Sequence, residues 1–191
     1  MNRTKRKIFE TSMKLFAEKG YDATSIEEIT SVVGVAKGTL YYHFSSKEEI
    51  FNFLIDEGMK LLQNSISIKI AQKNNSIEKL KSVVLIQLKI LYKYEDFIKI
   101  ILSQIWGHEA RNIQCQKYVT EYIHLIEEIV KSGIEAGEII DADPETIASE
   151  IFSTTCISQI YKIKKDKDIE ITTLYAELEN ILFNGLKNRK G

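Results

Sequence analysis

Residues that stiffen or cross-link a chain are scarce in this sequence, which has one proline and two cysteines among its 191 residues. No apolar run approaches the ~18 residues needed to span a membrane. The N-terminus lacks the apolar core and cleavage site of a secretory leader. Strand patterns are also absent. We therefore expect an all-α, cytoplasmic protein whose two distant cysteines, Cys115 and Cys156, are reduced.

Signatures of common enzyme sites are missing too, including a phosphate-binding loop and a nucleophile elbow. His108-Glu109 begins like a zinc-protease motif, but Asn112 stands where the second histidine would be needed. The other two histidines, His43 and His124, form no metal-ligand spacing with the cysteines. The sequence predicts a protein that is not an enzyme and has no metal or cofactor.

Net charge is low, at −1 for the whole chain, which taken alone argues against a nucleic-acid-binding protein. Its distribution is uneven, because Arg3, Lys5, Arg6 and Lys7 crowd the N-terminus while acids outnumber bases beyond residue 50. A local basic patch on a near-neutral body is typical of a modular DNA-binding protein. The basic arm would reach phosphate or the minor groove, or would be a disordered tail.

The most informative stretch runs from residue 24 to residue 44. Thr24 and Glu27 have the spacing of a capping box and predict the start of a short helix. Gly34 supplies a turn position suited to positive φ, and Ala36 begins a second helix. On that second helix Leu40 and Phe44 lie one turn apart and face inward. Helix, glycine turn and helix make a helix-turn-helix, whose second helix enters the major groove.

The second helix leaves several polar and aromatic side chains outside. Lys37 lies in the first turn, where the helix dipole disfavours a cation, so its place suggests a phosphate or a guanine edge opposite. Gly38 weakens a helix by up to ~1 kcal/mol, which is explained if DNA approaches the backbone closely. Thr39 suits a base edge or a thymine methyl group. The alternative is an ordinary surface helix with aromatic packing. The residues suited to phosphate are Tyr41, Tyr42 and His43.

These motifs, with Ser46-Lys47-Glu48-Glu49 after them, resemble the N-terminal domain of TetR-family transcriptional regulators over roughly the first fifty residues. The resemblance implies an all-helical homodimer that binds a palindromic operator and is released by a small molecule. It implies that Thr24 and Ser25 touch phosphate and that Tyr41, His43 and Lys47 hold phosphate. It also implies that the groove is faced by Lys37, Gly38, Thr39 and Tyr42. Ala36 departs from the family pattern, because a capping serine is common there.

Apolar periodicity predicts about nine helices in all. Besides the two already given, these cover residues 4–19, 46–71, 77–92, 95–106, 110–135, 143–162 and 172–186. They divide into a helix-turn-helix DNA-binding domain over residues 1–47 and a helical effector-binding and dimerisation domain over residues 48–191. The helix over residues 46–71 would connect the two mechanically.

A bundle of this kind can enclose a ligand between its helices. Aromatic and polar side chains there suit a largely apolar effector, such as a drug, a fatty acyl chain or an aromatic metabolite, although each could equally belong to the core or the surface. The candidates are Gln87, Tyr92, Gln104, Trp106, His108, Tyr118, Tyr122 and Cys156. The family resemblance adds a dimer interface from the last two long helices, with Ile147, Ile151, Thr155, Ser158, Leu174, Leu178, Ile181 and Leu182 as candidates.

The leading interpretation is thus a ligand-responsive repressor that binds double-stranded operator DNA as a homodimer. A thiol-based redox regulator is the first alternative and would require an exposed cysteine of low pKa. A small-molecule-binding helical protein without regulated DNA release is the second. The sequence does not name the effector, the operator or the regulated genes.

Overall fold

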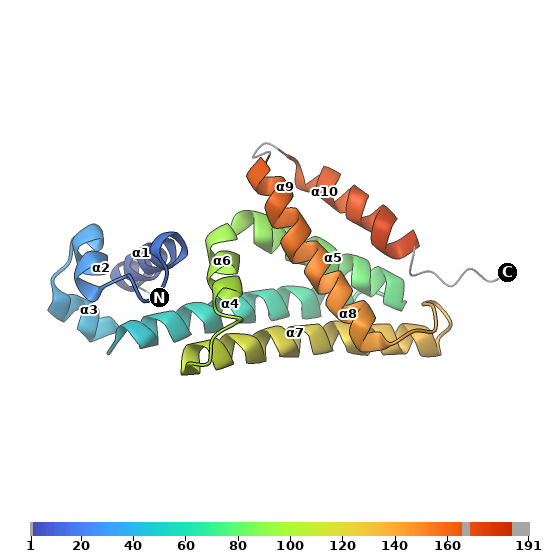
Figure 1. Cartoon of the computed structure of the whole chain (residues 1–191), viewed down its shortest axis with the longest axis horizontal. Coiled ribbons are helices and arrows are strands. Elements are labelled where there is room, and N and C mark those ends of the chain that lie inside the picture. Colours follow the sequence, from blue (N-terminus) through green and yellow to red (C-terminus); the bar gives the residue numbers. More distant parts are fainter. Residues whose placement is uncertain (1, 166–168, 185–191) are drawn as a thin grey trace. The chain divides into compact units, whose positions relative to one another are not determined.

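The computed structural model describes residues 2–165 and 169–184, and every regular element within these ranges is helical (Figure 1). The π-helical turn η1 joins α8 and α9 into one continuous helix, so the described ranges hold the nine helices that the sequence predicts. None of them is both long and apolar enough to cross a membrane. The elements are α1 (Arg3–Lys19), α2 (Ile26–Val33), α3 (Lys37–His43), α4 (Lys47–Ile70), α5 (Ser76–Lys93), α6 (Glu95–Ser103), α7 (Ala110–Glu135), α8 (Pro144–Ser153), η1 (Thr154–Ser158), α9 (Gln159–Lys165), α10 (Ile171–Leu178) and η2 (Glu179–Phe183).

Two compact units divide the chain. Unit 1 comprises Met1–Lys60 with Tyr94–Lys117, and unit 2 comprises Leu61–Lys93 with Tyr118–Gly191. Helices α4 and α7 each contribute a segment to both. Unit 1 therefore contains α6 and the start of α7 in addition to the helix-turn-helix, while the functional boundary at residue 47 stays a prediction.

The helix-turn-helix in unit 1 is organised by an apolar core. The helical spacing of apolar residues in α1, α2 and α3 turns one stripe of each helix inward. The side chains of Ile8, Phe16, Ile29, Leu40 and Phe44 are each at most 2% exposed. This core fixes which side chains of α3 remain outside.

The N-cap of α2 lies one residue after the predicted position. Ser25, not Thr24, is the N-cap, and its hydroxyl oxygen accepts a hydrogen bond from the N–H of Glu28 at 3.1 Å. The S-x-x-E spacing of a capping box is therefore present but shifted. Thr24 is buried, and its hydroxyl donates to the carbonyl of Gly20 at 2.8 Å. At the other end of α2, Gly34 adopts the left-handed conformation (φ 76°), as the turn prediction requires.

Unit 1 also contains a close approach between α4 and α6. A Cβ atom added to Gly58 would lie 2.2 Å from Cε2 of Phe97, far closer than non-bonded carbon atoms approach one another. The absence of a side chain at Gly58 therefore sets how tightly these two helices pack. After α6, Asn112 bridges the turn into α7 through its amide, which donates to the Gln104 carbonyl at 3.0 Å and accepts from the Glu109 N–H at 3.1 Å.

Unit 2 is built around α5, which packs against η1, α9 and α10. Leu80, Val84, Leu88 and Leu91 of α5 are buried, as the periodicity predicts. At the π-helical turn the hydroxyl of buried Thr155 donates to the Ile151 carbonyl at 2.7 Å, which gives this buried hydroxyl a partner within its own helix.

Some element ends differ from the prediction. Helix α6 ends at Ser103 rather than at residue 106, and α10 is capped by Glu170 rather than opened by a threonine. The residues of the predicted basic arm belong to the first turns of α1. In the charged loop predicted over residues 164–168, Lys165 still belongs to α9, and residues 166–168 lie outside the described ranges.

Candidate DNA interface and effector site

The surface of α3 carries the residues that the sequence assigns to DNA. We call Lys37, Gly38, Thr39, Tyr41, Tyr42 and His43 the reading face. Tyr42 is 83% exposed and Tyr41 is 50% exposed, whereas Thr39 and His43 are half-buried. A Cβ atom at Gly38 would meet no atom within 4 Å, and its φ is not positive, so nothing inside the fold requires a glycine there. The reading face thus presents one strongly exposed aromatic side chain beside an open stretch of helix backbone.

The N-terminus of α3 has no side-chain cap, since its N-cap residue is Ala36. The Thr39 N–H donates to the Ala36 carbonyl at 3.0 Å, which leaves the first-turn amides of Lys37 and Gly38 for an external acceptor such as a phosphate. Lys37, in this first turn, forms an ion pair with Glu27 of α2. The hydrogen bond between these two side chains raises the pKa of Lys37 above its ordinary value and lowers the pKa of Glu27 below its own. The sequence analysis missed this partner, although an acid in the first turn of α2 was a usable signal.

Two residues assigned to phosphate are used inside unit 1 instead. Burial of the Thr24 hydroxyl removes it from the surface, so Thr24 cannot touch phosphate with its side chain. Lys47 donates to the carbonyls of Tyr21 and Thr24, both at 2.8 Å, and its ammonium lies 4.2 Å from the Tyr21 ring centroid. Lys47 therefore fastens the turn between α1 and α2. Ser25 is exposed, but its hydroxyl is engaged as the α2 cap.

The basic N-terminus remains a candidate contact surface. Arg3, Arg6 and Lys7 are exposed on α1. Lys5 differs, because its ammonium lies 4.7 Å from the Phe44 ring centroid and makes a similar contact with a second ring, a cation–π arrangement. The cations are thus presented by a helix and not by a free arm.

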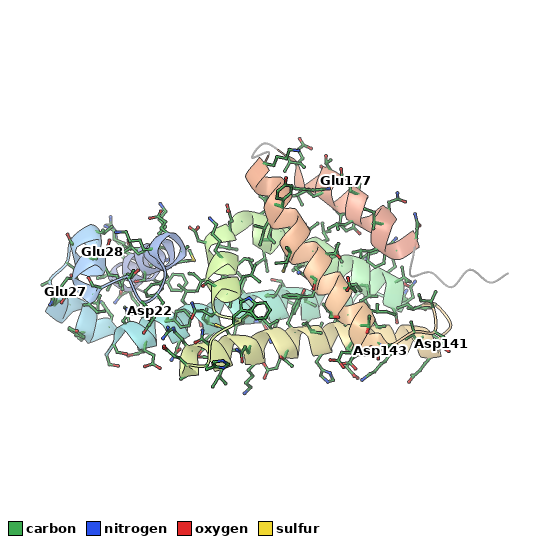
Figure 2. All side chains as sticks on the ribbon, in the orientation of Figure 1. Asp22, Glu27, Glu28, Asp141, Asp143 and Glu177 are labelled. Atoms are coloured by element: carbon green, nitrogen blue, oxygen red, sulfur yellow. The ribbon has the colours of Figure 1, made fainter. Side chains whose placement is uncertain are left out.

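A guanidinium ties the start of α7 to the turn between α1 and α2. One nitrogen of Arg111 donates to both carboxylate oxygens of Asp22, at 2.9 and 3.0 Å, and Nε donates to Oε1 of Gln104 at 3.1 Å. The guanidinium carbon lies 4.6 Å from the centroid of the Tyr21 ring. Figure 2 labels Asp22 within this unit. No motif in the sequence singled out Arg111, because its partner Asp22 lies 89 positions away along the chain.

The predicted effector residues divide between the two units. Gln104 lies in unit 1 and bonds Arg111 and Asn112, while Trp106, 86% exposed, and His108 are surface residues of the same unit. These three do not line a cavity in the core of unit 2. Of the others, Tyr92 is exposed and Tyr118 half-buried.

The remaining three residues form one buried polar cluster in unit 2, which we call the Gln87 cluster. The Tyr122 hydroxyl donates to Oε1 of Gln87 at 2.8 Å, and the Gln87 amide donates to Sγ of Cys156 at 2.9 Å. All three side chains are at most 3% exposed. Burial keeps the pKa of Tyr122 well above its ordinary value, so the hydroxyl stays protonated and can donate. Donors and acceptors are thus placed within an otherwise apolar core.

Both thiols are unsuited to redox sensing. Cys115 is 0% and Cys156 3% exposed. Burial raises the pKa of Cys115 to about 12 and that of Cys156 to about 11. Reactivity requires the thiolate, which is negligible at neutral pH with such values.

Most of the predicted dimer residues are buried within one chain. Ile147, Ile151, Thr155, Leu174 and Leu178 are each at most 7% exposed, which leaves them little surface to offer a second copy. These side chains contribute instead to the core of unit 2. Ile181 is exposed and Leu182 half-buried, and the side chain of Ser158 lies outside the described residues.

One exposed group in the described ranges has metal-ligand spacing. His124, Glu127 and Glu128 place one ligand atom each within 4.8 Å of one another. The ammonium of Lys131 already lies 2.8 Å from Glu127 and 2.9 Å from Glu128. A surface ion-pair network accounts for this group.

Comparison with known proteins agrees with this geometry. Residues 8–53 match the family described as bacterial regulatory proteins, tetR family. The chain is 25% identical over 187 residues to the fatty acid metabolism regulator protein of Bacillus subtilis (strain 168), covering 95% of each. A solved structure described as a fatty acid metabolism regulator of Clostridium perfringens is 35% identical, with a TM-score of 0.87 over 94% of this chain and 97% of its own. The FadR structure of Bacillus subtilis in complex with stearoyl-CoA is 24% identical, with a TM-score of 0.78 over 94% of this chain and 98% of its own. The chain therefore belongs to the TetR family, and it is a sequence-specific DNA-binding transcriptional regulator.

Proposed function

We propose that the protein is a homodimeric repressor of fatty acid metabolism genes, released from a palindromic operator by a long-chain acyl thioester of coenzyme A. The supporting observation is that the similarity to fatty acid metabolism regulators extends over 94–95% of this chain and is not confined to the helix-turn-helix. It acts in the cytoplasm, without an enzymatic step, and acyl-CoA is its effector and not a cofactor.

DNA binding would use the reading face in two ways. Tyr41, Tyr42 and His43, with the uncapped amides of α3, suit phosphate oxygens, which position the protein without reading sequence. Lys37 and Thr39 suit base edges in the major groove, and Gly38 lets the helix backbone come close. Two such helices, one from each protomer, would enter grooves about 34–36 Å apart.

Dimerisation would use exposed side chains at the end of unit 2. The large apolar side chains that unit 2 leaves exposed include Ile157, Tyr161 and Ile181, on η1, α9 and η2. Exposed apolar side chains on neighbouring helices favour an interface. We propose that these residues, rather than the buried set derived from the sequence, contact the second copy.

The effector would enter the core of unit 2 and meet the Gln87 cluster there. A thioester carbonyl is a hydrogen-bond acceptor, and both the Gln87 amide and the Tyr122 hydroxyl are buried donors. An acyl chain suits the surrounding aliphatic side chains of α5. Binding would require the cluster to open, which gives the effector a differential affinity for two arrangements of unit 2.

The proposal is tested by fluorescence anisotropy with the DNA upstream of the protein's own gene and an unrelated duplex, each at about 50 and 200 mM salt. We expect tight binding to the upstream DNA alone, lost in Lys37→Ala and Tyr42→Ala. Lys60→Ala, which removes an exposed lysine of α4 outside the reading face, is the control that should bind as the wild type. Equal, weak binding to both duplexes would contradict a repressor of its own gene.

The effector is tested by titrating the DNA complex with stearoyl-CoA, using free coenzyme A and stearate as controls. Release by stearoyl-CoA alone is the expected result, and release by all three or by none contradicts an acyl thioester effector. The redox alternative predicts release by peroxide that is lost in Cys115→Ser or Cys156→Ser. Because both thiols are buried, we expect no such release.

A further inference from the structure

The ion pair between Lys37 and Glu27 lies where DNA would bind. Lys37 is the first residue of α3, and Glu27 lies in the first turn of α2. Both side chains are more than half exposed. Glu27 therefore brings a carboxylate to a surface whose other features all suit an anion.

Two neighbouring acids on α2, Glu27 and Glu28, both labelled in Figure 2, have different partners. Glu28 pairs with Lys19 of α1, away from the reading face. Glu27 alone contacts a residue of the reading face. The difference provides a comparison for experiment, since both acids lie in the first turn of α2, near the positive end of the helix dipole, and each forms one ion pair with a lysine.

A carboxylate beside Lys37 disfavours phosphate as the partner of that ammonium. If Lys37 turned to a phosphate, Glu27 would be left unpaired close to the DNA backbone, where like charges repel. The cost applies to any sequence, so it weakens non-specific binding first. Both groups stay charged between about pH 5 and 9. The pKa of Glu27 lies below its ordinary value of ~4.3, and the pKa of Lys37 lies above its ordinary value of ~10.4.

One base pair satisfies both members of the ion pair together. In the major groove a G·C pair presents the O6 and N7 acceptors of guanine next to the N4 amino donor of cytosine. An ammonium and a carboxylate held side by side match that pattern. An A·T pair presents the N7 acceptor and N6 amino donor of adenine and the O4 acceptor and methyl group of thymine. Its donor separates two single acceptors, so an ammonium does not find the two adjacent acceptors that guanine offers, and the match is poorer.

We propose that Glu27 is a specificity-determining residue, which together with Lys37 selects a G·C pair in each operator half-site and penalises binding to other DNA. The proposal rests on DNA binding through α3, as described above. It assigns to α2 a direct part in sequence discrimination, beyond supporting the recognition helix.

The test compares the wild-type full-length protein with Glu27→Gln and Glu28→Gln. Each variant removes one first-turn acid and one ion pair, and thermal unfolding of all three reports any general loss of stability. Binding sites are selected from a random duplex pool and sequenced. Anisotropy then measures affinity for the selected duplex, for the duplex with the conserved G·C replaced by A·T, and for an unrelated duplex at the same two salt concentrations.

We expect the wild type to select a G·C pair whose replacement weakens binding roughly tenfold. In Glu27→Gln we expect this preference to fall to about twofold and the affinity for unrelated DNA to rise several-fold. The slope of log K against log salt concentration should become more negative by about 0.9 for each freed Lys37 that reaches a phosphate. Glu28→Gln should retain the wild-type preference and salt dependence.

A G·C preference that survives in Glu27→Gln overturns the proposal, whatever the affinity for unrelated DNA. An equal loss of affinity for all three duplexes in both glutamine variants also overturns it, since Glu27 would then only stabilise α2. If the wild type itself selects no sequence, the DNA-binding function fails together with this inference. Selection by the wild type of a motif without G·C at that position refutes only the role of Glu27.

Discussion

The Gln87 cluster permits a quantitative test of how unit 2 holds polar groups in its core. Tyr122→Phe would remove the hydroxyl that donates to Gln87 Oε1 at 2.8 Å, leaving that oxygen buried without a donor. A stranded buried polar atom costs ~1–3 kcal/mol, so we expect the free energy of unfolding to fall by about 2 kcal/mol. Gln87→Leu would instead leave the Tyr122 hydroxyl without an acceptor and would also remove the hydrogen bond from the Gln87 amide to Cys156. We expect this variant to lose about 2–3 kcal/mol of unfolding free energy.

The double variant Gln87→Leu/Tyr122→Phe leaves neither group stranded. We therefore expect its loss of stability to be smaller than the sum of the single losses by about 1–2 kcal/mol. Urea unfolding followed by far-UV circular dichroism measures all four proteins, at one protomer concentration because dimer stability depends on it. Tyr92→Phe, an exposed tyrosine of the same helix as Gln87, is the control and should change stability by less than about 0.5 kcal/mol. Losses that add to within about 0.5 kcal/mol would refute the hydrogen bond.

Three further substitutions have clear expected outcomes. Gly38→Ala meets open space, so stability should hold or rise by up to ~1 kcal/mol while anisotropy reports weaker DNA binding; unchanged binding would show that DNA does not approach this backbone. Gly58→Ala places a Cβ against Phe97 and should lower the urea midpoint by an amount equivalent to about 1–3 kcal/mol; a higher midpoint would contradict the close packing. Hydrogen bonds from Thr146 hold the pKa of Asp143 below its ordinary value, so its stabilisation is complete above the unfolded pKa of ~3.9 and is lost as pH falls through the folded value. Asp143→Ala should thus have a lower Tm than the wild type at pH 7, and a Tm difference that does not shrink as the pH falls below ~3.9 would contradict this cause.

Local patterns predicted the helices well because they depend on neighbours in sequence. Helix α7 begins and ends at the predicted residues, Ala110 and Glu135, and α8 begins after the predicted cap, Asp143. Gly34 takes the positive φ that its place in the turn suggests. The predicted N-cap of α2 is wrong by one residue, and the reason is a contact with another helix. Ser25 caps α2, while the buried side chain of Thr24 turns back and donates to the Gly20 carbonyl at the end of α1, a contact with the preceding helix that the capping pattern does not include.

The assignment of side chains to sites was less successful, for a physical reason. Periodicity reveals that one face of a helix is buried, but not whether the same chain or a second copy buries it. The family resemblance, and not periodicity, assigned Ile151 and Leu178 to a dimer interface, and both side chains are buried in the core of unit 2. An aromatic side chain such as Trp106 likewise suggested a pocket and is found on the surface.

The sequence by itself determined the helices, the helix-turn-helix and the residues of the reading face, because spacing, caps and glycine turns are properties of short segments. Only the tertiary structure decided that Glu27 pairs with Lys37, that Lys47 fastens a turn, and that Gln87, Tyr122 and Cys156 form one cluster. Each of these contacts joins residues at least ten positions apart. Hydrogen bonds and ion pairs at such separations depend on how helices pack, and a linear pattern of residue types does not record that packing.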